Sequence, residues 1–220
     1  KDREWGFNDR VDKVLKFLEN RELNNASYPF WFYQATDGKV WHENSDVADF
    51  IVDVADTGRL LVSLNNLREY SSTFSSRTNN LVYNTHHNRS DYSSIIPSLK
   101  AECETSVNIY AYYAISGFAA FWPNELAGAT SKVIDNMYSA GNVTTYGVTL
   151  PKGKITSDIL LCCIFEVKNV DPRLKDLTYQ VYLAHEAHYT TTRSYRAFGE
   201  GPSISSEWQW EWVVLPDGQT

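Results

Sequence analysis

The chain has 220 residues, a formal net charge of −7 and 43% hydrophobic residues, a composition typical of a globular protein with room for one sizeable domain. It contains no run of lysine or arginine that could follow a phosphate backbone, so we expect no nucleic-acid partner. It also contains no stretch of 18 apolar residues, so we expect no membrane span within it.

The start of the chain and three glycosylation triplets bear on where the protein acts. The sequence begins at Lys1 without a methionine, and we expect a processed product or a fragment of a longer surface protein. Asn25, Asn88 and Asn142 each open an Asn-x-Ser/Thr triplet, at which an exported protein can be glycosylated. These features favour a secreted or cell-surface location.

Helical periodicity dominates the first half of the chain. Val11, Leu15 and Leu18 recur at the spacing of one helix face. In contrast, PFWFYQATDGKVWHE alternates around an Asp-Gly pair that is typical of a hairpin turn. The elements expected here are a helix over 8–22, an aromatic hairpin over 29–43, a helix over 46–70, and a helix over 77–83 or one that continues towards 99.

The second half alternates apolar helices with short extended segments. SVNIYAYYAISGFAAF (106–121) is apolar nearly all round, which indicates a buried helix. Pro123 suits the first turn of the next helix, and Asp171-Pro172 opens the last one. The elements expected here are helices over 106–121, 124–139, 158–167 and 172–189, a strand or extended loop over 142–153, a strand over 206–214 and a turn over 215–218. Together these predict one mainly α domain, 1–220, of six or seven helices in antiparallel pairs.

Cysteine and histidine spacings predict no metal site. Cys103, Cys162 and Cys163 fit no zinc, haem or iron–sulfur pattern. One alternative is a disulfide from Cys103 to Cys162 or Cys163. Adjacent reduced thiols buried on a helix explain Cys162 and Cys163 equally well. His185 and His188 are three positions apart, where a zinc-protease motif needs four. The sequence carries no phosphate-binding or dinucleotide-binding glycine pattern, so we predict neither metal nor cofactor.

An acidic stripe in the second predicted helix is a candidate site. Its four aspartates, at positions 46, 49, 53 and 56, fall on one sector of a helix. Acids at a helix start oppose the macrodipole, and this explains the first two. Asp53 and Asp56 lie further in, aligned with the leucine face, and are the candidates for a cleft wall. A calcium site is the third alternative, and it needs further oxygens from other segments.

Two more acids stand beside aromatic residues near the end of the chain. Glu200 lies between glycines in RAFGEGP, and Glu211 lies among Trp208, Trp210 and Trp212. A glycosidase uses one carboxyl group to protonate the leaving oxygen and another to activate water or to attack. Tryptophan faces would hold the sugar rings. The alternative is a lid strand whose tryptophans cover the core.

Several motifs resemble a known family. DVADTGRLLVSLNNL (53–67), PFWFY before it, YGVTLPKG, and RAFGEGP followed by WEWVVLPDG occur in a similar order in archaeal and bacterial surface proteins with a glycosidase-like helical toroid domain. The resemblance covers most of the chain from about Pro29. It implies an (α/α) toroid, in which helical hairpins surround a central cleft, here incomplete because the chain is short. It also implies carbohydrate as the ligand.

The resemblance implies specific cleft residues. The implied catalytic carboxylates are Asp53, Asp56, Glu200 and Glu211, and the candidate sugar-binding aromatic residues are Trp41, Trp208, Trp210 and Trp212. We therefore expect an extracellular domain of glycoside-hydrolase type that acts on or binds polysaccharide. The alternative is a non-catalytic structural subunit of a cell-surface layer or filament, which would self-assemble.

Overall fold

A computed structural model describes residues 2–23, 29–30, 32–41, 54–83, 92, 95–195, 200–202, 208–210 and 213–218. In these residues the fold is mainly helical, as expected, with two small antiparallel sheets. The helices are α1 (Asp2–Asn20), α2 (Val54–Tyr70), α3 (Ser72–Tyr83), α5 (Ile96–Cys103), α6 (Ile109–Phe121), α7 (Ala129–Ser139), α8 (Ser157–Glu166) and α9 (Pro172–Thr192). The strands are β1 (Asn142–Thr145), β2 (Val148–Pro151), β3 (Glu200–Pro202) and β4 (Trp208–Trp210). Over the described residues, no helix is both long and apolar enough to cross a membrane.

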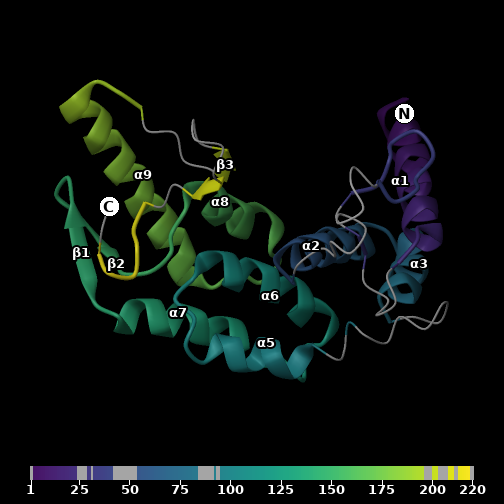
Figure 1. Cartoon of the computed structure of the whole chain (residues 1–220), viewed down its shortest axis with the longest axis horizontal. Coiled ribbons are helices and arrows are strands. Elements are labelled where there is room, and N and C mark those ends of the chain that lie inside the picture. The colour runs from purple at the N-terminus through teal and green to yellow at the C-terminus, as the bar shows by residue number, and fades with distance from the viewer. Residues whose placement is uncertain are drawn as a thin grey trace.

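Three successive helical pairs build the body of the molecule: α2 with α3, α6 with α7, and α8 with α9. The first helix of each pair also contacts the first helices of the other two pairs. Helices α2, α6 and α8 therefore form an inner group, and we call them the inner helices. Helices α1 and α3 lie at one end of the molecule, and α9 lies at the other beside the β1–β2 hairpin (Figure 1).

Helices α2 and α6 run in the same direction. Near their beginnings, Arg59 Nη1 donates to the Tyr110 hydroxyl over 3.1 Å. Near their ends, Arg68 Nη2 donates to the Ala120 carbonyl oxygen over 3.0 Å. Since both positions advance along the chain together, the two helices are parallel.

Glycines bring these two helices into backbone contact. A Cβ atom built on Gly117 would lie 2.1 Å from the Gly58 carbonyl oxygen, and one built on Gly58 would lie 2.3 Å from the Ala114 carbonyl oxygen. No side chain fits at such a distance, so only glycine at both positions permits this crossing. This close approach determines which residues along the rest of α2 and α6 lie opposite each other.

Helix α8 joins the same parallel group. Just before it, the Lys154 carbonyl oxygen accepts from the backbone N–H of Ile109 at the start of α6 over 3.0 Å. At its end, Glu166 accepts a hydrogen bond from Tyr113 through its carboxylate and one from Asn66 Nδ2 through its carbonyl oxygen. The C-terminal ends of α2 and α8 consequently lie beside each other.

The apolar stretch over 106–121 is a buried helix, as predicted. Asn108 caps α6 by accepting from the Tyr110 backbone N–H over 3.0 Å. Ten residues of α6 are buried, and Phe118 is fully shielded from solvent. Burial of one such side chain contributes about 1.5–3 kcal/mol. With ten of its 13 residues buried, α6 is the centre around which α2, α7 and α8 pack.

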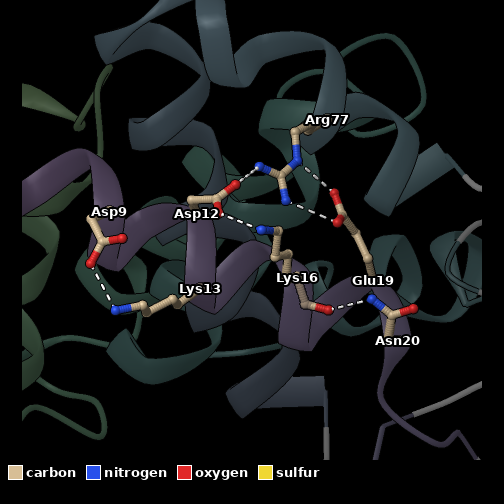
Figure 2. A network of polar contacts seen from close by, with 7 residues as sticks. All are labelled: Asp9, Asp12, Lys13, Lys16, Glu19, Asn20 and Arg77. Carbon is tan, nitrogen blue, oxygen red and sulfur yellow. Dashed lines mark hydrogen bonds and ion pairs between the residues drawn. The ribbon is translucent and has the colours of Figure 1, made fainter.

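An ion-pair network attaches α1 to α3 (Figure 2). Arg77 of α3 donates from Nε and Nη2 to both carboxylate oxygens of Glu19, over 2.7 and 2.9 Å, and from Nη1 to Asp12 over 2.8 Å. Lys16 pairs with the second Asp12 oxygen at 2.9 Å. These carboxylates, Glu19 first, raise the pKa of Arg77. Because the planar guanidinium of Arg77 binds two carboxylates of α1 at once, it fixes the rotation of α1 about its own axis.

Two helix starts differ from the sequence predictions. The first helix already begins at Asp2, where a start at residue 8 was expected. The six residues from Pro123 to Gly128 form turns, and the helix begins at Ala129 because Gly128 before it has φ +73°. A proline that suits a first helical turn also suits an isolated turn, so the prediction for 124–128 was wrong.

The extended segment over 142–153 is a hairpin, β1 paired with β2. Its turn residues Tyr146 and Gly147 have φ +49° and +79°, the geometry of a two-residue hairpin turn. The aromatic hairpin is confirmed by the antiparallel bridge between Tyr33 and Val40.

Helices α8 and α9 end within three residues of their predicted ends.

The remaining helices of the first half agree in part with the predictions. Helix α2 ends at Tyr70 as expected, whereas residues 46–53 lie outside the described residues. The uncertain helix over 77–83 begins earlier, at Ser72, and a separate helix, α5, precedes the buried α6.

The three cysteines are free. Cys103 and Cys163 have no exposed surface and Cys162 is half-buried. Of the two alternatives left open by the sequence, the structure therefore has reduced thiols and no disulfide.

Candidate functional site

A cavity of about 320 Å³ lies where the C-terminal ends of α2, α6 and α8 meet. Polar side chains from all three segments line it, and they include groups of both charges. The polar lining residues are Asn65, Arg68 and Glu69 of α2, Tyr112 and Ser116 of α6, Thr130 of α7, and Glu166, Lys168 and Asn169 at and after the end of α8. We call this cavity the inner pocket.

Arg68 is held in one position at the wall of the inner pocket. Its Nη2 donates to Asn65 Oδ1 over 2.6 Å and to the Ala120 carbonyl oxygen over 3.0 Å. Its Nη1 donates to Asn79 Oδ1 over 3.3 Å, and its guanidinium lies 4.3 Å from the centre of the Phe121 ring. A cation suits this place because the carbonyl ends of α2 and α6 carry partial negative charge.

Glu166 is oriented by a buried phenol. The Tyr113 hydroxyl, on a side chain only 1% exposed, donates a short hydrogen bond to Glu166 Oε2. Burial, together with the hydrogen bond and charge of Glu166, raises the pKa of Tyr113. The phenol therefore remains protonated and keeps donating, which holds the carboxylate in a defined orientation.

Glu69 is the second carboxylate of the inner pocket. Lys168 Nζ donates to Glu69 Oε2 over 2.5 Å, across the gap between α2 and the segment after α8. This hydrogen bond and the charge of Lys168 lower the pKa of Glu69. Glu69 is therefore ionised near neutral pH.

A second polar cluster lies at the opposite end of the inner helices. Asp56 is half-buried in the first turn of α2. Burial alone would lower the pKa of Arg59, but the hydrogen bond from Arg59 to Tyr110 and the nearby charges, Asp56 among them, raise it. Asp56 therefore shares the electrostatic environment of an arginine, and it does not line the inner pocket.

The other predicted carboxylates are only partly placed. Asp53 and Glu211 lie outside the described residues, as do Trp212, Asn25 and Asn88. The backbone of Glu200 lies in β3, opposite Trp210 of β4. The glycine loop and the tryptophan tail thus form one hairpin.

The structure also places three other predicted residues. The backbone of Trp208 lies opposite Pro202 in the β3–β4 hairpin. Trp41 is 40% exposed and packs edge-to-face against Phe32, with ring centres 5.9 Å apart. Asn142 is exposed at the start of β1, as a glycosylation site requires.

Histidine geometry differs from that of a metal centre. His185 Nε2 lies 2.9 Å from the Ser157 hydroxyl at the start of α8, and His188 packs against Tyr146. Within the described part of the chain, no three His, Cys, Asp or Glu side chains converge to hold a metal ion.

Sequence reasoning did not select the residues of the inner pocket. One signal could have found Glu166: it ends the apolar run DILLCCIFE, and the macrodipole disfavours an acid in the last helical turn. Residues such as Asn65 and Arg68 carry no such signal, because any polar residue suits the end of a helix.

The chain was compared with known proteins. The family described as "Protein of unknown function (DUF3131)" matches residues 3–210, so the chain belongs to this family. No curated protein and no solved structure matches the chain.

Proposed function

We propose that this DUF3131 domain is a secreted or cell-surface domain of glycoside-hydrolase type that binds polysaccharide in its inner pocket. The observation that carries the proposal is the position of that pocket: it lies among three parallel inner helices and is lined by hydrogen-bonding groups of both charges. The arrangement suits a ligand that is rich in hydroxyl groups and carries few charges, which describes a sugar.

The helix arrangement supports an incomplete (α/α) toroid. In a toroid, successive helical hairpins place one helix inside and one outside, and the inner helices run in the same direction. The pairs α2–α3, α6–α7 and α8–α9 follow this order, and their first helices contact one another. The described residues form three such pairs, fewer than a closed ring requires, so the inner pocket would form an open groove.

The described carboxylates support binding better than cleavage. A glycosidase needs one protonated carboxyl group near neutral pH, and a raised pKa provides it. Lys168 instead lowers the pKa of Glu69, and the Tyr113 hydroxyl already occupies Glu166 Oε2. A general acid would then come from three residues implied by the family resemblance, namely Asp53, Glu200 and Glu211, because Asp56 does not line the inner pocket.

A glycan-binding experiment tests the proposal. Wild-type protein, Glu166→Gln and Glu102→Gln would be titrated with a panel of neutral oligosaccharides by calorimetry. Glu102 is exposed on α5 and does not line the pocket, so its variant is the matched control. We expect Glu166→Gln to weaken binding about tenfold, the effect of one lost charge-assisted hydrogen bond. Binding to no member of the panel, or equal binding by Glu166→Gln, would contradict the proposal.

A cleavage assay tests the catalytic part separately. New reducing ends would be measured with the best-bound oligosaccharide for wild type, Asp53→Asn and Glu200→Gln. If cleavage occurs, we expect both variants to lose at least about 100-fold in rate, as for other acid–base residues. Wild-type rates in both variants would show that these two carboxylates are not catalytic.

One observation favours the alternative function of a structural surface subunit. Large apolar and aromatic side chains are exposed on α8 and α9: Leu161, Phe165, Tyr179 and Tyr182, with Phe165 81% exposed. Such residues on a surface are typical of protein–protein contacts. If the chain self-assembles through them, sedimentation would show oligomers that Phe165→Ser disperses, and wild-type protein that stays monomeric at high concentration would count against this function.

A further inference from the structure

A second and larger cavity lies between the end of α1 and the aromatic hairpin. Its volume is about 770 Å³. It is lined by Lys16, Phe17, Asn20 and Arg21 on one side and by 33–38 of the hairpin on the other. None of these residues lines the inner pocket, so the cavity is a separate site.

Arg21 is unusual among the arginines of this protein. Its Nε–H is buried, and no described residue accepts a hydrogen bond from it. In comparison, Arg77 and Arg173 each donate to two carboxylates, and Arg68 donates to amide oxygens. A buried N–H of a guanidinium is costly without an acceptor. Because Arg21 lines the cavity, a ligand bound there would supply the missing acceptor.

The cavity has an ordered aromatic wall. Phe17 of α1 packs edge-to-face on Tyr33, with ring centres 5.2 Å apart. The Tyr33 hydroxyl accepts from the Phe30 backbone N–H over 2.9 Å and donates to the Glu22 carbonyl oxygen over 2.7 Å. Gly38 lies so close that a Cβ atom there would be 3.3 Å from the Phe17 ring. These contacts fix the hairpin against α1 and keep the cavity open between them.

The remaining charges of the cavity are already paired. Lys16 binds Asp12, which also binds Arg77 (Figure 2). Asp37 accepts from the Lys39 backbone N–H over 3.0 Å and lies 3.8 Å from its ammonium. Among the described lining residues, Arg21 therefore supplies the charge that has no paired partner, and this charge is positive in a protein of net charge −7. An anionic group is the ligand that this charge selects.

We propose that this cavity binds the carboxylate of a uronic acid residue, a sugar acid, through the guanidinium of Arg21. The Nε–H and a neighbouring Nη–H of one guanidinium match the two oxygens of a carboxylate. The aromatic wall suits the apolar face of a sugar ring, and the side chains of Asn20, Gln34 and Thr36 suit its hydroxyls. The choice of a sugar rests on the proposed function, and the choice of a carboxylate rests on Arg21 alone.

Calorimetric titration with matched small ligands tests the proposal. Methyl β-glucuronide would be compared with methyl β-glucoside, which lacks only the carboxylate, and with acetate and inorganic phosphate, which lack the sugar. Arg21→Gln removes the charge, and Arg21→Lys keeps the charge but removes the planar fork. Arg10→Gln, at an exposed position of α1 outside the cavity, is the control.

We expect the glucuronide to bind at least about tenfold more tightly than the glucoside. Both Arg21 variants should lose this preference, and Arg10→Gln should keep it. Equal binding of glucuronide and glucoside, or an unchanged preference in Arg21→Gln, would overturn the proposal. Tighter binding of phosphate or acetate than of the glucuronide would also overturn it.

The result is separable from the test of the inner pocket. Glu166→Gln lies in the other pocket and should leave glucuronide binding unchanged. If no neutral glycan binds but Arg21-dependent glucuronide binding persists, the inner-pocket proposal fails and this one stands. The opposite pattern refutes the uronate site alone.

Discussion

The close crossing of α2 and α6 predicts that Gly117→Ala destabilises the protein strongly. The added Cβ atom would lie 2.1 Å from the Gly58 carbonyl oxygen, whereas ordinary contact begins at 3.4 Å. Both clashing groups are backbone, so no rotamer change relieves the overlap and the helices must separate by more than about 1 Å. Overpacking typically costs about 1–3 kcal/mol, and separation also weakens the hydrogen bond from Arg68 to Ala120.

The expected net effect is smaller than the clash itself. Alanine is favoured over glycine in a helix by about 0.8–1.0 kcal/mol, and this gain offsets part of the cost. We therefore expect Gly117→Ala to lower the free energy of unfolding by about 2 kcal/mol, since a backbone clash belongs at the upper end of the overpacking range. Urea denaturation followed by circular dichroism at 222 nm would measure it.

Gly6→Ala in α1 is the matched control, since nothing lies within 4 Å of a Cβ atom there. It should leave the stability unchanged or raise it by up to about 1 kcal/mol. Gly58→Ala should behave like Gly117→Ala, and the double variant should lose less than the sum, because the first substitution already separates the helices. If Gly117→Ala stays within about 0.5 kcal/mol of wild type, the reasoning about the crossing is refuted.

Two further predictions concern ionisable groups. The hydrogen bonds from Arg173 lower the pKa of Asp171, the capping residue of α9. The stability from this pair is fully present above the unfolded pKa of about 3.9 and is lost as pH falls through the lower folded pKa. Asp171→Asn, which retains a capping oxygen, should therefore lose less stability than wild type between about pH 5 and 3; equal slopes in urea titrations would contradict this. Burial raises the pKa of Cys103 to about 11 and raises that of Cys163 well above its usual value. Both thiols should therefore resist Ellman's reagent at pH 8 in the native protein and react after unfolding, whereas rapid labelling of all three native cysteines would be inconsistent with this burial.

Local signals in the sequence were sufficient for most helices and turns. The all-round apolar pattern of 106–121 predicted a buried helix, since a helix with no polar face has no stable place at a surface. Asp171-Pro172 marked the start of α9, and the Asp-Gly pair marked the aromatic hairpin, because both depend on neighbouring residues only. The start of α7 could not be predicted in this way, because Pro123 suits a turn as well as a helix.

The candidate site depended on contacts that no local pattern contains. Spacing along one helix selected Asp53 and Asp56, and the resemblance added Glu200 and Glu211; of these the structure describes the surroundings of Asp56 alone. That aspartate lies at the opposite end of α2 from the inner pocket. Glu166, Glu69 and Arg68 line the same pocket only because three parallel helices pack with their C-terminal ends together.

The sequence by itself determined most of the helical segments, which helix is buried and where the hairpins turn, since these follow from periodicity and from the backbone preferences of individual residues. Only the tertiary structure decided which helix ends converge. That choice follows from the backbone contact between Gly58 and Gly117, two residues far apart in the chain. It also left the Nε–H of Arg21, a residue that lines a cavity, buried with no described acceptor. A spacing along one segment cannot report such contacts, because they depend on how separate segments pack.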